Sequence, residues 1–326
     1  MRLILALASL KFTPVGLVLL GIASIAVYKF DDSAAAWLSL PLLLLAVNLI
    51  AAVATNGVFR KQMPLLVFHL ALIALVLLAA AGRLMYLKGR AEVTVGTGFA
   101  GLSYRDAGPL HLDRVADVHF TNEGFEIAYM AGPVLDRLVN RVRWRDDEGA
   151  ERVADIELNK PLILFGYRIY PTSNKGFAPV LLWQPEQGEP ILAAVHLPQY
   201  PGDATNQAQS WHPAGTKDDI WIMLEVEEGL IASDKPSRFR LPEKQKIIVR
   251  HQSGRWEMRP GDRIALPGGM LEYRELRTWM GYRFFSDWTI PWMLASCVVA
   301  VLSLSWHFWR KFASAPWNKD NALHGT

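Results

Sequence analysis

Apolar residues along the chain gather in a few long runs, and polar residues fill the space between two of them. The apolar runs cover residues 12–28, 35–55, 64–83 and 288–309, whereas 88–286 mixes polar, charged and apolar positions. An α-helix rises about 1.5 Å per residue, so about 20 apolar residues cross the ~30 Å hydrocarbon core of a bilayer. Each run therefore predicts a transmembrane helix.

These runs divide the chain into parts. We expect three N-terminal transmembrane helices in 1–87, a polar domain in 88–286, a fourth transmembrane helix in 287–311 and a tail in 312–326. The predicted fold is an integral membrane protein with four transmembrane helices and a large extracytoplasmic, antiparallel, β-rich domain.

The first apolar run has two interpretations. Arg2 gives a basic start and residues 23–26 are small, as in a cleavable signal peptide. A second apolar run follows after a short polar turn at Lys29, Asp31 and Asp32, and two helices so closely linked form a membrane hairpin. We therefore favour an uncleaved helix over 12–28.

Short alternating segments rich in Val, Ile, Tyr and Trp fill the polar domain, as is typical of strands. Turn signals such as Asn122–Glu123–Gly124 separate them, and the stretch 198–216 predicts a long surface loop. Strands that recur about every 10–12 residues predict a sandwich-like domain. The predicted strands cover 91–95, 117–121, 125–130, 140–144, 152–158, 161–171, 179–184, 190–197, 219–227, 246–251 and 255–260.

Basic residues at the ends of the apolar runs predict the orientation. With four helices, one side of the membrane receives Arg2, Lys11, Arg60, Lys61, Arg310 and Lys311. Loops rich in Lys and Arg stay in the cytoplasm. We therefore expect both termini in the cytoplasm and the β-rich domain outside the inner membrane.

Composition excludes several functions. The net charge of +3, without a continuous basic run, does not indicate nucleic-acid binding. The single cysteine, Cys297, allows no disulfide within the chain and no C-x-x-C motif, which excludes thiol–disulfide exchange and covalent c-type haem attachment to this chain. The chain also lacks the phosphate-binding, dinucleotide-binding, serine-hydrolase and zinc-protease motifs. We therefore expect no catalytic residues.

His69 is the first candidate site residue. It lies about six residues, or roughly 9 Å, inside the run 64–83. An ionisable side chain at this depth indicates a functional site. It is either a ligand or a neutral histidine hydrogen-bonded to a neighbouring helix. Asn48 has a similar depth on the preceding run, so a hydrogen bond that orients the imidazole is possible, although we favour a role in joining helices.

The remaining candidates have simpler explanations. His307 near the end of the fourth run suits a second haem ligand or an interfacial anchor beside Trp306 and Phe308. Arginines in 137–145 suit a solvated strand edge better than an anion site such as one for haem propionates, and lipid phosphates suit Arg83 and Lys88. We expect ordinary structural roles for the histidines of the polar domain, which are His111, His119, His196, His212 and His251.

Several segments of the chain resemble those of a known protein family. The segment LLVFHLALIALVLLAAAGR (65–83) resembles the F-H-L helix of the ResB/CcsB-type cytochrome c biogenesis proteins. ASLKFTPVGLVLLGIAS (8–24) is similar to the first helix of that family, LLLLAVNLIAA (42–52) to its second, and PLILFGYRIYPTSNKGFAP (161–179) to its G-Y-x-x-Y region. The order of three helices, a large β-rich domain and a last helix also matches the family.

The resemblance implies a membrane subunit of the bacterial inner membrane that handles haem b. Family members act with a CcsA/ResC-type partner to export haem and ligate it to apocytochrome c outside the membrane. The family's third-helix histidine, a haem ligand, corresponds to His69, whereas the tryptophan-rich W-W-D motif belongs to the partner and is lacking here. The domain in 88–286 is shorter than in many relatives, and His307 receives no role from the resemblance. The alternative is a membrane scaffold or chaperone that does not bind haem.

Overall fold

The computed structural model describes residues 2–30, 36–146, 148–213, 216, 218–252 and 254–313. The chain divides into two compact units. The helical unit consists of Met1–Lys88, Asp106–Leu112 and Ser286–Thr326, and the β unit consists of Gly89–Arg105 and Asp113–Phe285.

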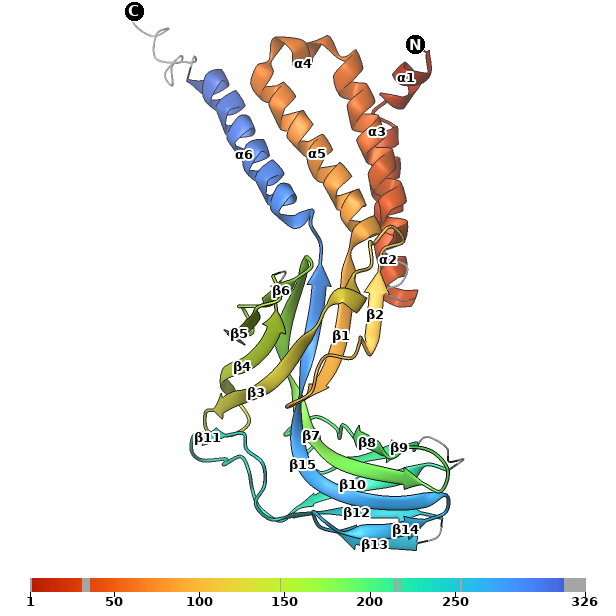
Figure 1. Ribbon diagram of the computed structural model, residues 1–326. Helices are drawn as coiled ribbons and strands as arrows, with labels where there is room; N and C mark the ends of the chain where they lie inside the picture. Colours follow the sequence, from red (N-terminus) through yellow and green to blue (C-terminus); the bar gives the residue numbers. More distant parts are fainter. Residues whose placement is uncertain are drawn as a thin grey trace, which may run out of the picture. The chain divides into compact units, whose positions relative to one another are not determined.

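Long apolar helices form most of the helical unit (Figure 1). The helices are α1 Arg2–Leu7, α2 Phe12–Phe30, α3 Ser39–Thr55, α4 Gly57–Lys61, α5 Met63–Met85 and α6 Ile290–Phe312. The spans Phe12–Lys29, Ala36–Thr55, Met63–Met85 and Ile290–Phe312 are long and apolar enough to cross a membrane, which confirms the four predicted helices. The predicted polar turn after Lys29 and most of the predicted tail lie outside the described residues.

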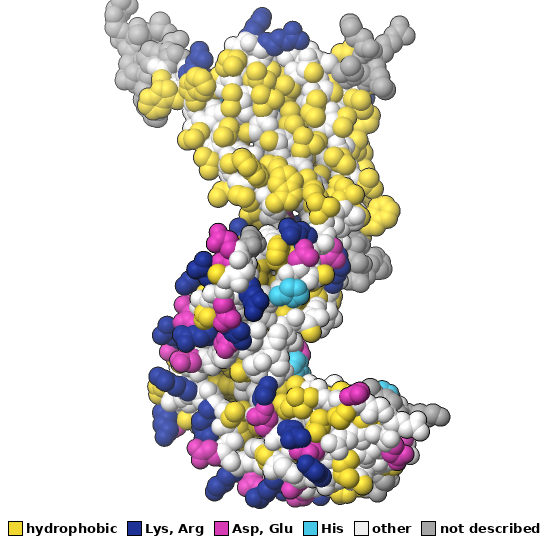
Figure 2. Space-filling model, in the orientation of Figure 1, with side chains coloured by type: hydrophobic (Ala, Val, Ile, Leu, Met, Phe, Trp, Pro, Cys, Tyr) yellow, Lys and Arg dark blue, Asp and Glu magenta, His cyan; other side chains and the backbone are white. Residues whose placement is uncertain are grey.

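The surface of these helices is suited to lipid. At most 28% of the residues in any of the four spans are buried, although the spans are strongly apolar. Large side chains such as Ile25, Leu294 and Val301 are more than 60% exposed. Figure 2 shows hydrophobic side chains over the helices, with Lys and Arg gathered at the end where α4 lies. Such a continuous apolar surface in water would drive aggregation, so a bilayer is its natural environment.

Antiparallel sheets build the β unit. One sheet has the order β2-β1-β15-β7-β6, with β14 also pairing with β15 and β8 with β7; the second has the order β13-β12-β10-β9, and the third β11-β3-β4-β5. The strands are β1 Leu87–Thr94, β2 Tyr104–Ala107, β3 Phe120–Tyr129, β4 Leu135–Arg145, β5 Glu151–Ile156, β6 Leu162–Leu164, β7 Tyr167–Pro185, β8 Ile191–Ala194, β9 Ala208–Trp211, β10 Ile220–Val226, β11 Ser237–Arg238, β12 Gln245–His251, β13 Gly254–Met258, β14 Arg263–Leu266 and β15 Gly269–Ser286. The antiparallel, β-rich prediction is confirmed.

Two long strands, β7 and β15, contribute to more than one core. Toward the ends that meet at Pro185 and Gly269, they pack against the β10–β12 sheet through a cluster that includes Trp183, Ile222 and Val249. All three of these side chains are fully buried. Alternate residues of a strand point to opposite faces, so the fully apolar inner faces of both sheets are shielded from water.

A buried polar network joins β3, β4 and β15. Tyr282 donates its hydroxyl to Asn140 Oδ1 at 2.8 Å, and Asn140 Nδ2 donates to Asn122 Oδ1 at 2.8 Å. Asn122 Nδ2 in turn donates to the Val93 carbonyl at 2.9 Å. Buried polar groups are costly without partners, so this chain of hydrogen bonds fixes how β3 and β4 pack on the larger sheet.

Several detailed strand predictions were wrong. Residues 122–124, predicted as a turn, form a bulge inside β3, and this one strand contains residues 120–121 of the segment predicted at 117–121 and most of the segment predicted at 125–130. Residues 161–171 turn back as the β6–β7 hairpin rather than forming one strand. The predicted loop at 198–216 contains β9, and β15 was not predicted at all.

Candidate functional site

His69 lies in the second turn of α5, about 9 Å along the helix from its first residue. Its ring is partly buried and is in contact with two aromatic side chains. The centroid of Phe59 on α4 lies 4.5 Å from that of His69, and the Phe68 ring meets it edge-on at 5.2 Å. The imidazole therefore lies in an apolar, aromatic setting.

One hydrogen bond sets the tautomer of His69. Its Nδ1 lies 2.7 Å from the carbonyl oxygen of Leu65, one turn earlier on α5. A carbonyl oxygen only accepts, so Nδ1 carries the proton and the neutral ring keeps its lone pair on Nε2. This is the form in which imidazole ligates haem iron, because the second nitrogen donates to a carbonyl and fixes the orientation of the ring.

The structure does not bring Asn48 to His69. Asn48 Nδ2 donates to the carbonyl oxygens of Leu7 at 2.6 Å and Ser9 at 3.1 Å, and its Oδ1 accepts from the Thr13 hydroxyl at 2.8 Å. Both amide hydrogens and the acceptor are thus directed to α1, α2 and the turn between them. Asn48 therefore joins α3 to the start of the chain, which is the role that the sequence favoured, and the alternative of a hydrogen bond to His69 is not formed.

His307 and His69 are not brought into contact either. Helices α5 and α6 pack together, and Ala71, Ala74, Leu77, Leu78 and Ala81 are the α5 residues that line an apolar groove between them. At about 100° per residue, His69 lies about 140° around α5 from the centre of that lining. His307 has only an edge-on contact with Phe308, at 5.5 Å. The structure thus offers one histidine, not a bis-histidine pair, at the position of His69.

The groove between α5 and α6 has a volume of about 650 Å³ and is almost entirely apolar. Trp288, which precedes α6, and Trp292, which lies in α6, line one end of the groove. Both indoles are at least half exposed. Near that end, Arg83 approaches Asp287 at 3.8 Å and lies over the Tyr86 ring at 5.0 Å. Arg83 therefore has an ion pair and a cation–π contact within the protein, and Lys88 lies over the same ring at 5.7 Å.

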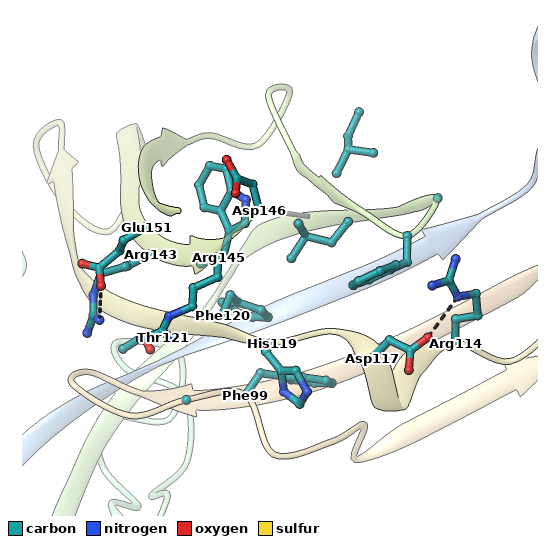
Figure 3. A pocket seen from close by; sticks show the side chains of 16 residues that line it. Phe99, Arg114, Asp117, His119, Phe120, Thr121, Arg143, Arg145, Asp146 and Glu151 are labelled. Carbon is teal, nitrogen blue, oxygen red and sulfur yellow. Dashed lines mark hydrogen bonds and ion pairs between the residues drawn. The ribbon is translucent and has the colours of Figure 1, made fainter. Parts of the chain in front are cut away.

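The β unit also contains a cleft of about 1120 Å³ (Figure 3). We call it the His119 cleft and define it by its lining: Gly98, Phe99, Arg114, Asp117, His119, Phe120, Thr121, Arg143, Trp144, Arg145, Asp146, Glu151, Ile163, Leu164, Phe165 and Gly166. The lining combines aromatic rings with cations. Its volume is at the upper end of the range of small-molecule sites.

His119, directly before β3, and Arg145, at the end of β4, line the same cleft. Phe120 pairs with Trp144 and Thr121 with Arg143, and continuing this register by one residue places Arg145 opposite His119. Opposed side chains in an antiparallel pair lie on the same face. Figure 3 shows the His119 ring beside Phe99 and the Arg145 side chain extending toward Thr121. Both side chains are exposed to solvent.

Carboxylates hold two of the three arginines in this cleft. Arg143 pairs with Glu123 at 2.7 Å and with Glu151 at 3.4 Å, and the hydrogen bond that it donates to Glu123 raises the pKa of its guanidinium. Arg114 pairs with Asp117 at 3.0 Å. Within the described part of the chain, Arg145 has no ion pair and His119 has no hydrogen bond. Among the arginines that line this cleft, Arg145 is therefore the one that the described residues leave without a carboxylate.

Phe165 occupies an unusual backbone position at the rim of the cleft. With Gly166 it forms the two-residue turn between β6 and β7, and its φ is +51° while that of Gly166 is +82°. Hairpin turns of this kind favour Asn-Gly, because a side chain such as Phe costs about 1–2 kcal/mol at positive φ. The ring is nevertheless 40% exposed, and the guanidinium of Arg114 lies 4.5 Å from its centroid.

The other histidines of the polar domain have the structural roles that the sequence predicted. His111 bonds to the Met85 carbonyl, His196 to Thr94 and Glu92, and His212 to Asp219. Among the described residues, no three His, Cys, Asp or Glu side chains lie close enough to hold a metal ion together.

A comparison with families of known proteins matches part of this chain. The model of the ResB-like family matches residues 51–200, a stretch that contains α5 with His69 and the whole lining of the His119 cleft. No curated protein matches the chain.

Proposed function

Because this match assigns the chain to the ResB/CcsB type and so implies a role in cytochrome c biogenesis, we propose that it is the haem-holding membrane subunit of a cytochrome c assembly complex. His69 is the axial ligand to the iron of haem b. A CcsA/ResC-type membrane partner completes the pocket, and apocytochrome c is the acceptor. The chain itself contributes binding and orientation rather than a catalytic residue.

The single observation that supports this proposal is the state of the His69 imidazole. Its Nδ1 proton is held by the Leu65 carbonyl, so Nε2 has a lone pair for iron. Phe59 and Phe68 provide apolar contact at the same point. Haem supplies the iron and an apolar ring, and both match what these three residues offer.

A single histidine also suits transfer. The described residues bring neither Asn48 nor His307 to His69. The second axial ligand must then come from the partner or from solvent. Because this chain supplies only one axial ligand, it holds haem weakly enough for transfer to apocytochrome c.

Charge supports the orientation that we propose. The last turn of α4 contains Arg60 and Lys61, and the last turn of α6 contains Arg310 and Lys311. Basic residues at helix ends favour the cytoplasmic side. We therefore place His69 toward the cytoplasmic face and the β unit on the periplasmic side of the bacterial inner membrane.

The test uses the complex purified with its multispanning, tryptophan-rich partner. We expect the His69→Gly variant to lose the Soret band of bound haem and free imidazole to restore it, because imidazole fills the space left by the side chain. The control is His307→Gly, which should retain the band without imidazole. An unchanged band in His69→Gly, with normal assembly, would support the scaffold alternative instead.

A further inference from the structure

The His119 cleft has the chemistry of a site that the membrane histidine does not explain. It lies wholly within the β unit, and its lining includes the imidazole of His119, the guanidinium of Arg145, the exposed ring of Phe165 and the half-buried ring of Phe99 around a volume of about 1120 Å³. None of these groups belongs to the cores described above. We propose that this cleft is a second binding site, which takes a planar aromatic macrocycle with carboxylate groups, of the iron-porphyrin class.

The iron ligand in this site is His119. Its ring is exposed beside Phe99, and no hydrogen bond ties up either nitrogen in the part of the chain that the structure describes. The soluble histidines discussed above differ, because His111, His196 and His212 each bond to a carbonyl, hydroxyl or carboxylate. A neutral imidazole with an open nitrogen is a common axial ligand.

The carboxylate partner is Arg145. It faces the same side of the β3–β4 pair as His119, one step beyond the Phe120–Trp144 pair. Glu123 and Asp117 already neutralise the neighbouring cations Arg143 and Arg114. Arg145 alone then offers the planar, two-pronged geometry that guanidinium uses to bind carboxylates.

The aromatic wall explains why a planar ring fits better than a small anion. Phe99 stacks on Phe120 and Phe284 with centroids 5.5 Å and 4.9 Å apart, which fixes its position at the floor. Phe165 stays exposed at a turn whose backbone favours Asn or Gly. A residue kept against its conformational preference indicates a function for its ring. Phe99 and Phe165 line the same cleft as His119, and aromatic rings in a lining suit a ring system rather than a phosphate or a metal alone.

This inference rests on the proposed function only for the identity of the ligand. The experiment therefore removes both membrane histidines first. Full-length protein in detergent with His69→Ala and His307→Ala is titrated with ferric protoporphyrin IX and, separately, with metal-free protoporphyrin IX. Soret absorbance reports iron ligation, and quenching of tryptophan fluorescence reports binding of either ring.

We expect this background to bind both porphyrins, with a spectrum of histidine-ligated iron. Adding His119→Ala should abolish the spectrum of ligated iron and weaken haem binding at least about tenfold. Loss of a residue that only hydrogen-bonds a metal ligand already lowers metal affinity by about that factor. The same change should leave the metal-free ring nearly unaffected. Arg145→Gln should weaken both porphyrins several-fold without shifting the haem spectrum.

Matched controls are His212→Ala and Arg137→Gln, which change an exposed histidine and an exposed arginine outside the cleft. All variants must keep the thermal unfolding temperature of the background. The proposal is overturned if the background binds no haem, if His119→Ala behaves like His212→Ala, or if an acidic aromatic peptide occupies the cleft where porphyrins do not. The outcome for His69 in the assembled complex is independent of each of these results.

Discussion

Lys175 on β7 is a cation in the interior of the β unit, and its removal should make the protein more stable. The residue is 3% exposed. Its Nζ donates to the Ser173 carbonyl at 3.2 Å and lies 5.1 Å from the centroid of the Tyr129 ring. In the described part of the chain, no carboxylate lies within ion-pair distance of this amine. Burial therefore lowers the pKa of Lys175 from 10.5 to about 8.

This pKa sets both the size and the sign of the effect. A fall from 10.5 to about 8 corresponds to about 3 kcal/mol against the charged amine in the folded state. Below pH 8 this full penalty opposes folding. Between about pH 8 and 10.5 the unfolded chain binds more protons than the folded chain, so the free energy of unfolding rises with pH. Lys175→Met keeps most of the volume and removes the charge, at the cost of the Ser173 hydrogen bond and the contact with Tyr129.

We therefore expect Lys175→Met to raise the free energy of unfolding of the β unit by about 1–3 kcal/mol at neutral pH, because a well-packed apolar group replaces an unpaired buried charge. It should also flatten the rise above pH 8. Pulse proteolysis of the full chain in urea, repeated across this pH range, measures both quantities. Lys235→Met is the control, because Lys235 is exposed. A less stable Lys175→Met protein that retained the full pH dependence would refute the reasoning.

Three further changes test other parts of the β unit. Tyr282→Phe should lower the free energy of unfolding by about 1–3 kcal/mol, because it leaves the Asn140 amide oxygen buried without its donor; urea titration measures this loss. Glu228→Gln should flatten the acid dependence of unfolding between about pH 4.5 and 2. The hydrogen bond from Arg240 lowers the pKa of Glu228 from 4.5 to about 2, so its stabilising effect is complete above the higher value and is lost as the pH falls to the lower one. Phe165→Asn should raise the thermal stability by about 1 kcal/mol, because it relieves the positive φ, and it should weaken porphyrin binding in the titration above.

The four long apolar helices could be predicted because their composition alone determines them. A run of about 20 apolar residues has few structures open to it other than a membrane helix. The short helix α4, by contrast, was not predicted, although Asn56 caps it by accepting from the Val58 amide. A one-turn helix contributes too few apolar positions for a period to be visible in the sequence.

The long strand β15 was missed for a different physical reason. Its pairing with β7 shifts register between Tyr273 and Glu275 and again between Met280 and Tyr282. At the first shift Arg274 is an extra residue in β15, and at the second Gly281 lies opposite residues 172–174 of β7, so the alternation of apolar and polar positions is interrupted along one continuous strand. The sequence at residues 122–124 predicts a turn because glycine is common in turns. Glycine is also common in bulges, and Gly124 has a positive φ in the bulge that these residues form.

The sequence could single out His69 but not the His119 cleft. His69 is conspicuous because every close neighbour in the chain is apolar, so one residue is enough to indicate a site. His119, Arg145 and Phe165 are separated by at least 20 residues from one another, and each alone resembles an ordinary surface side chain. Only the register of β3 and β4 and the β6–β7 turn bring them to one cleft.

The four arginines of β4 show what geometry adds to such a pattern. The sequence presents Arg137, Arg141, Arg143 and Arg145 as one basic edge, for which solvation is the simplest explanation. In the structure, Arg141 pairs with Asp155 at 3.0 Å and Arg143 with Glu123 at 2.7 Å, so their charge is already balanced. Of the two that the described residues leave without a carboxylate, Arg145 lines the His119 cleft and Arg137 does not. The alternative of an anion site thus narrows from a charged edge to one guanidinium in the cleft that also contains His119, and mutation of these two residues can test it.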